Sequence, residues 1–168
     1  MPTSAISSET PVRPAAWLHA LLLVGRVALG LVFLIAAYTK FHFNGAWHFG
    51  DYHFFFGMAI DSYNILPLWG VQLMARGLPW FEVALGLLLI AGIGLRWTGL
   101  AACGLLLVFI AAMTRAYLLH LEIACGCFGN NEKLGPLTLL RDSSLLVLAG
   151  AVTAGAFLVT KPRNVVSS

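Results

Sequence analysis

Four long apolar runs, each interrupted by one or two polar residues, dominate the pattern along the chain. They cover residues 17–39, 78–95, 97–119 and 138–160, and charged or turn residues separate them. The hydrocarbon core of a bilayer is about 30 Å thick, so a helix needs roughly 20 apolar residues to cross it. The pattern predicts an all-α fold, an integral membrane four-helix bundle over residues 17–160.

The segments at the two ends of the chain do not continue this pattern. Residues 1–16 are rich in Ser, Thr and Pro and lack the positive start and compact apolar stretch of a signal peptide. We expect a disordered N-terminal tail over residues 1–16 and a C-terminal tail over residues 161–168.

The connection between the first two spans is aromatic. Rings of this kind favour the headgroup layer of a membrane, so we expect a long outer loop that carries one or two short interfacial helices. Pro67 and Pro79 mark breaks, and Pro79 suits the first turn of the second span, where its missing N–H costs nothing. The aromatic residues of the loop are Phe41, Phe43, Trp47, Phe49, Tyr52, Phe54, Phe55, Phe56, Tyr63 and Trp69.

Small residues indicate where helices pack closely, because backbones can approach each other there. The fourth span is rich in them, which predicts a tight contact with a neighbouring helix. A short echo also links residues 27–31 with residues 83–87, both Val-Ala-Leu-Gly-Leu. Arg26 and Glu82 precede the two copies, but antiparallel spans place them at different depths, so chance similarity is the simpler explanation. The small residues of the fourth span are Ala149, Gly150, Ala151, Ala154, Gly155 and Ala156.

Composition narrows the class of protein further. Hydrophobic residues make up 60% of the 168 and charged residues 10%, against about 45–50% and about 25% in soluble domains. These values argue against a soluble globular enzyme and against intrinsic disorder. The net charge is +3, but the ten Lys and Arg residues stand singly, so no nucleic-acid partner is expected. The expected partner is the lipid bilayer.

Positive charges at the helix ends predict the orientation. Cytoplasmic ends carry an excess of Lys and Arg. When Arg76, Arg115 and Arg141 are set aside as residues at or inside helix ends, four positive residues lie on the N-terminal side and two on the other. This predicts N-in, C-in topology, with residues 40–77 and 120–137 on the outer face. The counted residues are Arg13, Arg96, Lys161 and Arg163 against Lys40 and Lys133.

The strongest chemical motif is Cys125-Gly126-Cys127, in the outer connection before the fourth span. Two thiols around one glycine can close a small strained disulfide, and strained, exposed disulfides are the exchanging kind. Nearby positive charge would favour the thiolate. Idle turn cysteines or a permanent bridge are the alternatives. A zinc site would need further ligands, of which only His120 and Glu122 are local, so no metal is expected.

A second set of candidate residues is Glu82, Arg115, Arg141 and Asp142. Ionisable groups at membrane depth usually pair or line a cavity, so Glu82 is expected to pair with Arg115 or Arg141. Anchoring at the headgroup level is the alternative for each residue. Beside the cysteines, the set would outline a pocket for a quinone or for the active-site loop of a partner.

Other candidate residues give weaker evidence for a chemical role. The spacing of His42, His48 and His53 is not the i, i+4 spacing that brings two ligands together on a helix, so a haem or copper site is not expected. Cys103 suits a small packing residue. P-loop, GxSxG, HExxH and dinucleotide motifs are absent from the sequence.

Several of these pieces together resemble the DoxX-like family, and within it the MauE branch. They are the segment 26–33 leading to Lys40, the segments 63–67 and 78–86, then Cys125-Gly-Cys-Phe-Gly129, and the pair Arg141-Asp142. The resemblance implies a four-helix membrane protein that acts with a thioredoxin-like partner in forming disulfides during maturation of an extracytoplasmic enzyme. For some relatives, the resemblance also implies a quinone as cofactor. Residues 43–56 look like an insertion, which leaves the partner and substrate open.

The leading hypothesis is a bacterial inner-membrane thiol-redox protein in which Cys125 and Cys127 exchange disulfides with a thioredoxin-like partner. The alternative is a non-catalytic subunit or assembly factor of a larger membrane complex, respiratory or quinone-linked. A quinone-linked oxidoreductase is a third hypothesis. A family alone does not fix a function, so the site must decide among them.

Overall fold

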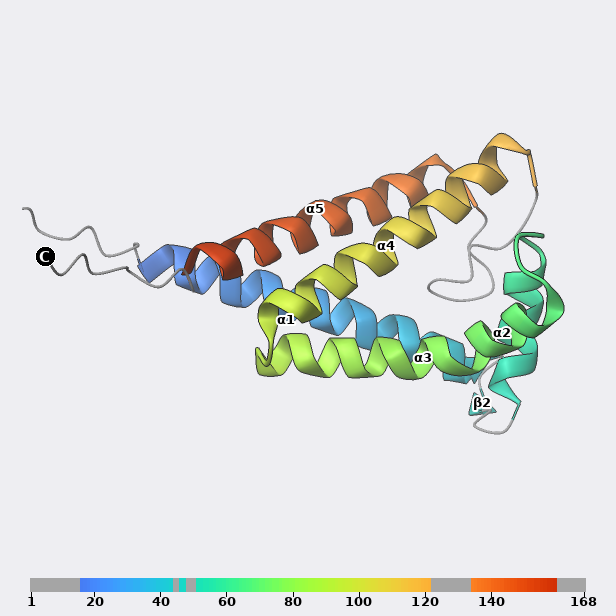
Figure 1. The fold of residues 1–168 in the computed structure, drawn as a ribbon, viewed down its shortest axis with the longest axis horizontal. Coiled ribbons are helices and arrows are strands. Elements are labelled where there is room, and N and C mark those ends of the chain that lie inside the picture. The colour runs from blue at the N-terminus through green and yellow to red at the C-terminus, as the bar shows by residue number, and fades with distance from the viewer. Residues whose placement is uncertain (1–15, 44–45, 48–50, 122–133, 160–168) are drawn as a thin grey trace, which may run out of the picture.

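Four long helices form the protein, as the computed structural model shows (Figure 1). The structure describes residues 16–43, 46–47, 51–121 and 134–159. Each of the four helices is long and apolar enough to cross a membrane, which confirms the predicted all-α membrane bundle. The helices are α1 (Ala16–Phe41), α3 (Leu68–Ala91), α4 (Leu95–Leu118) and α5 (Pro136–Val159).

Shorter elements lie together at one end of the bundle, which we call the α2 end (Figure 1). The helix α2 (Tyr52–Asp61) is the expected short helix of the aromatic connection. Two strands of two residues each, β1 (His42–Phe43) and β2 (Ala46–Trp47), pair antiparallel just before it and were not expected. The rings of Tyr52 and Phe41 lie 4.9 Å apart, so α2 is packed against the end of α1.

The second membrane helix differs from the sequence prediction. It was expected over 78–95 with Pro79 in its first turn, whereas α3 begins at Leu68 and Pro79 lies inside it. Pro67 is the N-cap residue, so only this proline marks a break. The apolar pattern missed the first ten residues because Gln72 and Arg76 interrupt it.

A side chain from α2 supports the backbone of α3 near this proline. Pro79 has no N–H to donate to the carbonyl of Ala75, four residues earlier, and its ring crowds the preceding turn. The hydroxyl of Tyr52 donates to the carbonyl oxygen of Arg76 at 3.0 Å, and the Trp80 indole donates to the same hydroxyl at 3.1 Å. Tyr52 therefore ties α2 to α3 at the proline.

The opposite end, which we call the turn end, is formed by a tight connection between α3 and α4. Gly92 and Gly94 have φ of +75° and +58°, in the left-handed region that glycine adopts most easily. The amide of Gly92 donates to the carbonyl of Leu88 at 2.9 Å and closes α3. The start of α1 and the end of α5 lie at this same end (Figure 1).

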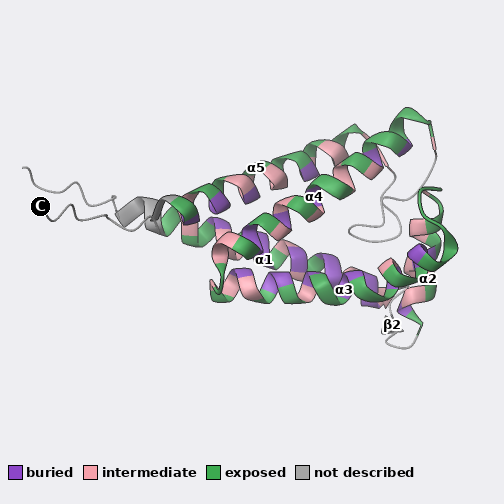
Figure 2. Ribbon diagram, viewed as in Figure 1, coloured by how far each residue is buried: buried purple, intermediate pink, exposed green. Residues whose placement is uncertain are grey.

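The core runs along the inner faces of the four helices, while their outer faces stay apolar and exposed (Figure 2). Leu29, Leu89, Ala102, Leu106 and Ala149 are buried in its main cluster. Exposed apolar side chains are expected here because lipid surrounds the bundle.

The small residues of α5 serve the packing only on one side. Ala149 and Ala156 are buried, and Gly155 faces Leu22 of α1 so closely that a methyl group would overlap it. Ala151 and Ala154 are exposed instead. The predicted close contact of this helix is therefore made by the face that carries Ala149 and Ala156.

Candidate functional site

A buried ion pair links α1 to α3. The ammonium of Lys40, in the last turn of α1, lies 2.9 Å from both carboxylate oxygens of Glu82. The two side chains are 3% and 1% exposed, so water has almost no access to either. Lys40 also donates to the carbonyl of Ala36 at 3.2 Å.

The position of Glu82 explains this pairing. Because α3 begins at Leu68, Glu82 lies near the middle of the helix instead of at its outer end. A charge at membrane depth is expensive and must find a partner. Lys40 supplies it, whereas the sequence indicated Arg115 or Arg141.

Asp142 lies beside the pair. Lys40, Glu82 and Asp142 line one small cavity of about 20 Å³, together with apolar residues that include Phe33 and Phe109. Asp142 is 2% exposed. A cavity of this size holds about one water molecule. The structure thus brings three ionisable groups from α1, α3 and α5 around a single water-sized space.

The two arginines of the predicted set lie differently. Arg141 donates from Nε to Oδ1 of Asp142 at 3.0 Å, so it joins the cluster through its neighbour. Arg115 is exposed and donates to the backbone carbonyl of Tyr63 at 3.0 Å. The side chain of Arg115 therefore contacts the connection before α3 and does not pair with Glu82.

Lys40 was missed as a site residue. Its charge was used for topology, although it ends a long apolar helix that contains no carboxylate. A buried carboxylate in one span and a lysine ending another could have been matched if the depth of Glu82 had been known. The misplaced start of the second span concealed that depth.

A larger apolar cavity opens on the other side of Lys40. Its volume is about 220 Å³, and its lining includes Lys40, Phe56, Tyr63, Met74 and Met113. The Lys40 ammonium also lies 5.2 Å from the centroid of the Phe56 ring. Lys40 and Phe109 line both cavities.

The predicted catalytic residues Cys125 and Cys127 lie outside the described residues. The described residues that flank this segment, Leu121 and Leu134, lie at the α2 end of the bundle. Leu134 packs against Met113, which lines the larger cavity.

Cys103 and His42 make packing contacts. The sulfur of Cys103 is 3.8 Å from the hydroxyl of Thr153. His42 stacks on Tyr38, with ring centroids 5.3 Å apart. Across the described ranges, no three His, Cys, Asp or Glu residues are grouped as metal ligands would be, and His48 lies outside those ranges.

Comparison with known proteins identifies the family of the chain. A family model described as the methylamine utilisation protein MauE matches residues 18–155. The methylamine utilization protein MauE of Paracoccus denitrificans is 32% identical over 133 residues, which are 77% of this chain and 67% of that protein. No solved structure matches the chain. The link to the wider DoxX-like family stays a prediction from the sequence. The chain belongs to the MauE family.

Proposed function

We propose that this chain is a membrane thiol-redox protein whose Cys125 and Cys127 exchange disulfides with a thioredoxin-like partner. The observation that carries the proposal is the Cys-Gly-Cys motif in a chain of the MauE family. The family and the relative are both described as methylamine utilisation proteins, which supports methylamine utilisation as the setting of this activity. The exchange would serve maturation of an extracytoplasmic enzyme.

The exchange needs no further reactant. A thiolate of one protein attacks the disulfide of the other, forms a mixed disulfide and releases a thiolate. The second thiol of the attacking pair then displaces the partner, so one protein gains a disulfide and the other gains two thiols. Two electrons pass between the proteins in either direction.

The buried cluster supports a site at the α2 end of the bundle. Lys40, Glu82 and Asp142 are desolvated, which is expensive, and ionisable groups inside membrane helices commonly carry function. In this proposal Glu82 and Asp142 accept or supply the protons that thiols release or take up. Arg141 positions Asp142 through its 3.0 Å hydrogen bond.

A quinone is the second candidate reactant, favoured by the apolar cavity of about 220 Å³ beside Lys40. If the cysteines are reoxidised by a quinone, two thiols become a disulfide and the quinone takes two electrons and two protons to become a quinol. The ring of Phe56 and the ammonium of Lys40 would hold the quinone head group. Bound quinone in the purified protein, and its loss in a Met113→Trp variant that fills the cavity, would support this route.

The protein is proposed to lie in the bacterial inner membrane with both termini inside. The distribution of Lys and Arg supports this orientation, since positive residues gather on the cytoplasmic side. The Cys-Gly-Cys segment then faces the extracytoplasmic compartment, where thiols meet oxidising partners.

The experiment that tests the proposal labels cysteines in intact cells. A membrane-impermeant maleimide is added before and after mild reductant, and the gel shift is read for wild type and for Cys125→Ser and Cys127→Ser. Cys103 is the internal control, because it lies within α4 against Thr153. For an outward-facing exchanging disulfide, we expect labelling of the wild type only after reduction. We expect either variant to change this labelling pattern.

Two outcomes would contradict the proposal. Labelling that does not depend on reductant would mean idle thiols. A Cys125→Ser, Cys127→Ser double variant could also co-purify with a larger complex. If that complex kept its full activity, the result would favour the non-catalytic subunit instead.

A further inference from the structure

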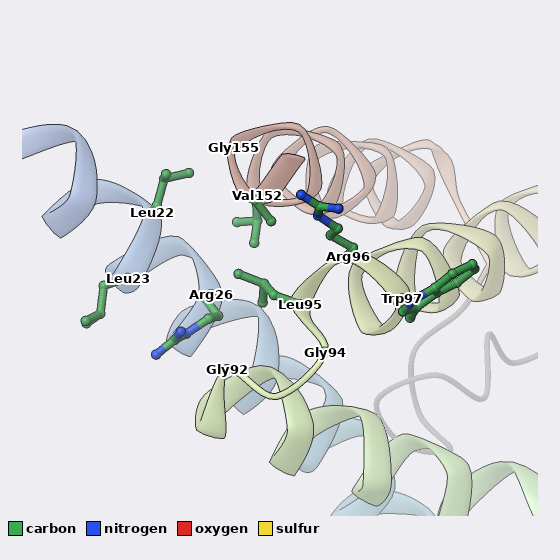
Figure 3. A pocket seen from close by; sticks show the side chains of 11 residues that line it. Leu22, Leu23, Arg26, Gly92, Gly94, Leu95, Arg96, Trp97, Val152 and Gly155 are labelled. Carbon is green, nitrogen blue, oxygen red and sulfur yellow. The ribbon is translucent and has the colours of Figure 1, made fainter. Parts of the chain in front are cut away.

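A large cavity lies at the turn end of the bundle, away from the ion pair, and Figure 3 shows the side chains that line it. Its volume is about 560 Å³, within the range of about 300–1,000 Å³ that small-molecule pockets span. Residues of α1, of the α3–α4 turn and of α5 line it, among them Leu22, Arg26, Gly92, Arg96 and Val152. The thiol-redox proposal gives this cavity no role.

Two positively charged side chains line this cavity, and they lie on different sides of it (Figure 3). Arg26 and Arg96 both line it, and none of its described lining residues is acidic. The guanidinium of Arg96 is held over the ring of Phe157, with Cζ 5.1 Å from the ring centroid. Two cations without a carboxylate between them favour an anionic ligand.

Arg26 is held in place without an anionic partner. Its guanidinium lies against Gly92 so closely that a methyl group there would overlap it. Its Nε is buried, and no acceptor for it is found among the described residues. A buried donor left unsatisfied is expensive, so a ligand oxygen that accepts from it would be stabilising.

The start of α4 adds to the positive potential. Its N-cap residue is Gly94, which has no side chain to cap the helix, and Gly94, Leu95 and Arg96 line the cavity. The first amides of a helix lack partners within it, and they carry the positive end of the helix dipole. Backbone amides and arginines together form the usual setting for phosphate groups.

The rest of the lining is apolar and reaches the surface that meets lipid. Leu23 is 54% exposed and Trp97 is 78% exposed, and both line the cavity. The candidate spans of α1 and α4 begin at Ala20 and Leu95, so the cavity lies at the boundary of the membrane. An exposed tryptophan is typical of that boundary.

We propose that this cavity binds the headgroup of an anionic phospholipid. The phosphodiester would accept a hydrogen bond from Arg26, Arg96 would add its positive charge to the headgroup site, and the acyl chains of the lipid would lie along Leu22, Leu23 and Val152. The ligand is a lipid and not a free anion, because the polar wall and the exposed apolar wall belong to the same cavity.

Native mass spectrometry of the full chain in detergent tests the proposal. The protein is titrated with phosphatidylglycerol or with phosphatidylcholine of the same acyl chains. Both lipids carry the phosphodiester, but only phosphatidylcholine adds a choline cation, which the two arginines would repel, so we expect at least about tenfold tighter binding of the anionic lipid. The double variant Arg26→Gln, Arg96→Gln is expected to lose this preference. Arg76→Gln is the matched control, because Arg76 is exposed on α3 at the α2 end.

Three results would overturn the proposal. Equal binding of the two lipids by wild type would do so without any variant, and therefore does not depend on the folding of a mutant. Retention of the preference in the double variant would remove the arginines from the site. Stabilisation of lipid-free protein by inorganic phosphate, with no lipid preference, would replace the lipid by a soluble anion. Arg26→Lys keeps the charge and is expected to keep most of the preference.

Discussion

Gly30 of α1 and Gly86 of α3 face each other where the two helices cross, and a methyl group on either would lie 2.8 Å from the carbonyl oxygen of the other. The two glycines occupy matching places in the repeated segments 27–31 and 83–87. The repeat therefore marks a contact between two helices, whereas the sequence alone favoured chance similarity. Such close approach of backbones is how membrane helices associate without a hydrophobic driving force.

Substitution at this crossing should destabilise the bundle. A Gly86→Ala change places a methyl group against the Gly30 carbonyl and against Leu34, so the helices must separate. We expect a loss of about 1–3 kcal/mol in the free energy of unfolding. Gly104→Ala is the control, because the described structure has no atom within 4 Å of its added methyl group. Unfolding in mixed micelles measures both, and equal stability of the two variants would contradict the predicted crossing.

Removal of one member of the buried ion pair should be more damaging than removal of both. Glu82→Gln leaves the Lys40 ammonium without its carboxylate at 3% exposure, a loss of about 3–5 kcal/mol. The double variant Lys40→Met, Glu82→Leu should recover most of this stability. If the pair serves the proposed disulfide exchange, the double variant should lack that activity. The readouts are unfolding in micelles and the yield of folded protein.

An exposed carboxylate provides the control for that experiment. Asp61→Asn removes one negative charge at the exposed end of α2 and should leave stability unchanged. If Glu82→Gln behaved like Asp61→Asn, the buried pair would have no energetic importance.

The hydroxyl of Tyr52 should contribute measurably to the junction of α2 with α3. Tyr52→Phe removes the bond to the Arg76 carbonyl and the acceptor for the Trp80 indole. We expect a loss of about 1 kcal/mol. Tyr117→Phe is the matched control, since Tyr117 is 44% exposed. Proteolysis of the connection before α3 should become faster in Tyr52→Phe only, and equal rates would show that the hydroxyl does not hold α2.

A reporter joined after Ser168 should reveal the proposed orientation. Green fluorescent protein is expected to fluoresce at this position and alkaline phosphatase to be inactive, because both ends of the chain are proposed to be cytoplasmic. A Lys161→Gln, Arg163→Gln variant should weaken this preference if positive residues determine it. An active phosphatase fusion in the unmodified chain would reverse the orientation.

The sequence predicted those features that depend on one helix at a time. Apolar length revealed four spans, and ring content revealed a short helix at one end. The start of α3 was missed because Gln72 and Arg76 interrupt the apolar pattern, and Pro79 lies inside the helix where Tyr52, from another element, bonds to the nearby backbone. Local patterns carry no information about that bond.

The site was predicted in the same partial way. Glu82 and Asp142 were chosen as buried ionisable residues, and they line one cavity. Lys40 was missed because its pairing depends on the relative depths of two helices. The cavity between Arg26 and Arg96 also needs three helices to meet, so no single stretch of sequence indicates it.

The contact between α1 and α5 has a consequence for how the protein is made. Gly25 lies against Val152 and Leu148, and Gly155 lies against Leu22, so the first and last spans share one seam. The ribosome makes α5 after α1. Until α5 enters the bilayer, this face of α1 lacks α5 as a partner. A chain that stalls before α5 would therefore present Leu22 and Gly25 to other membrane proteins, where quality-control proteases and insertion chaperones could recognise them.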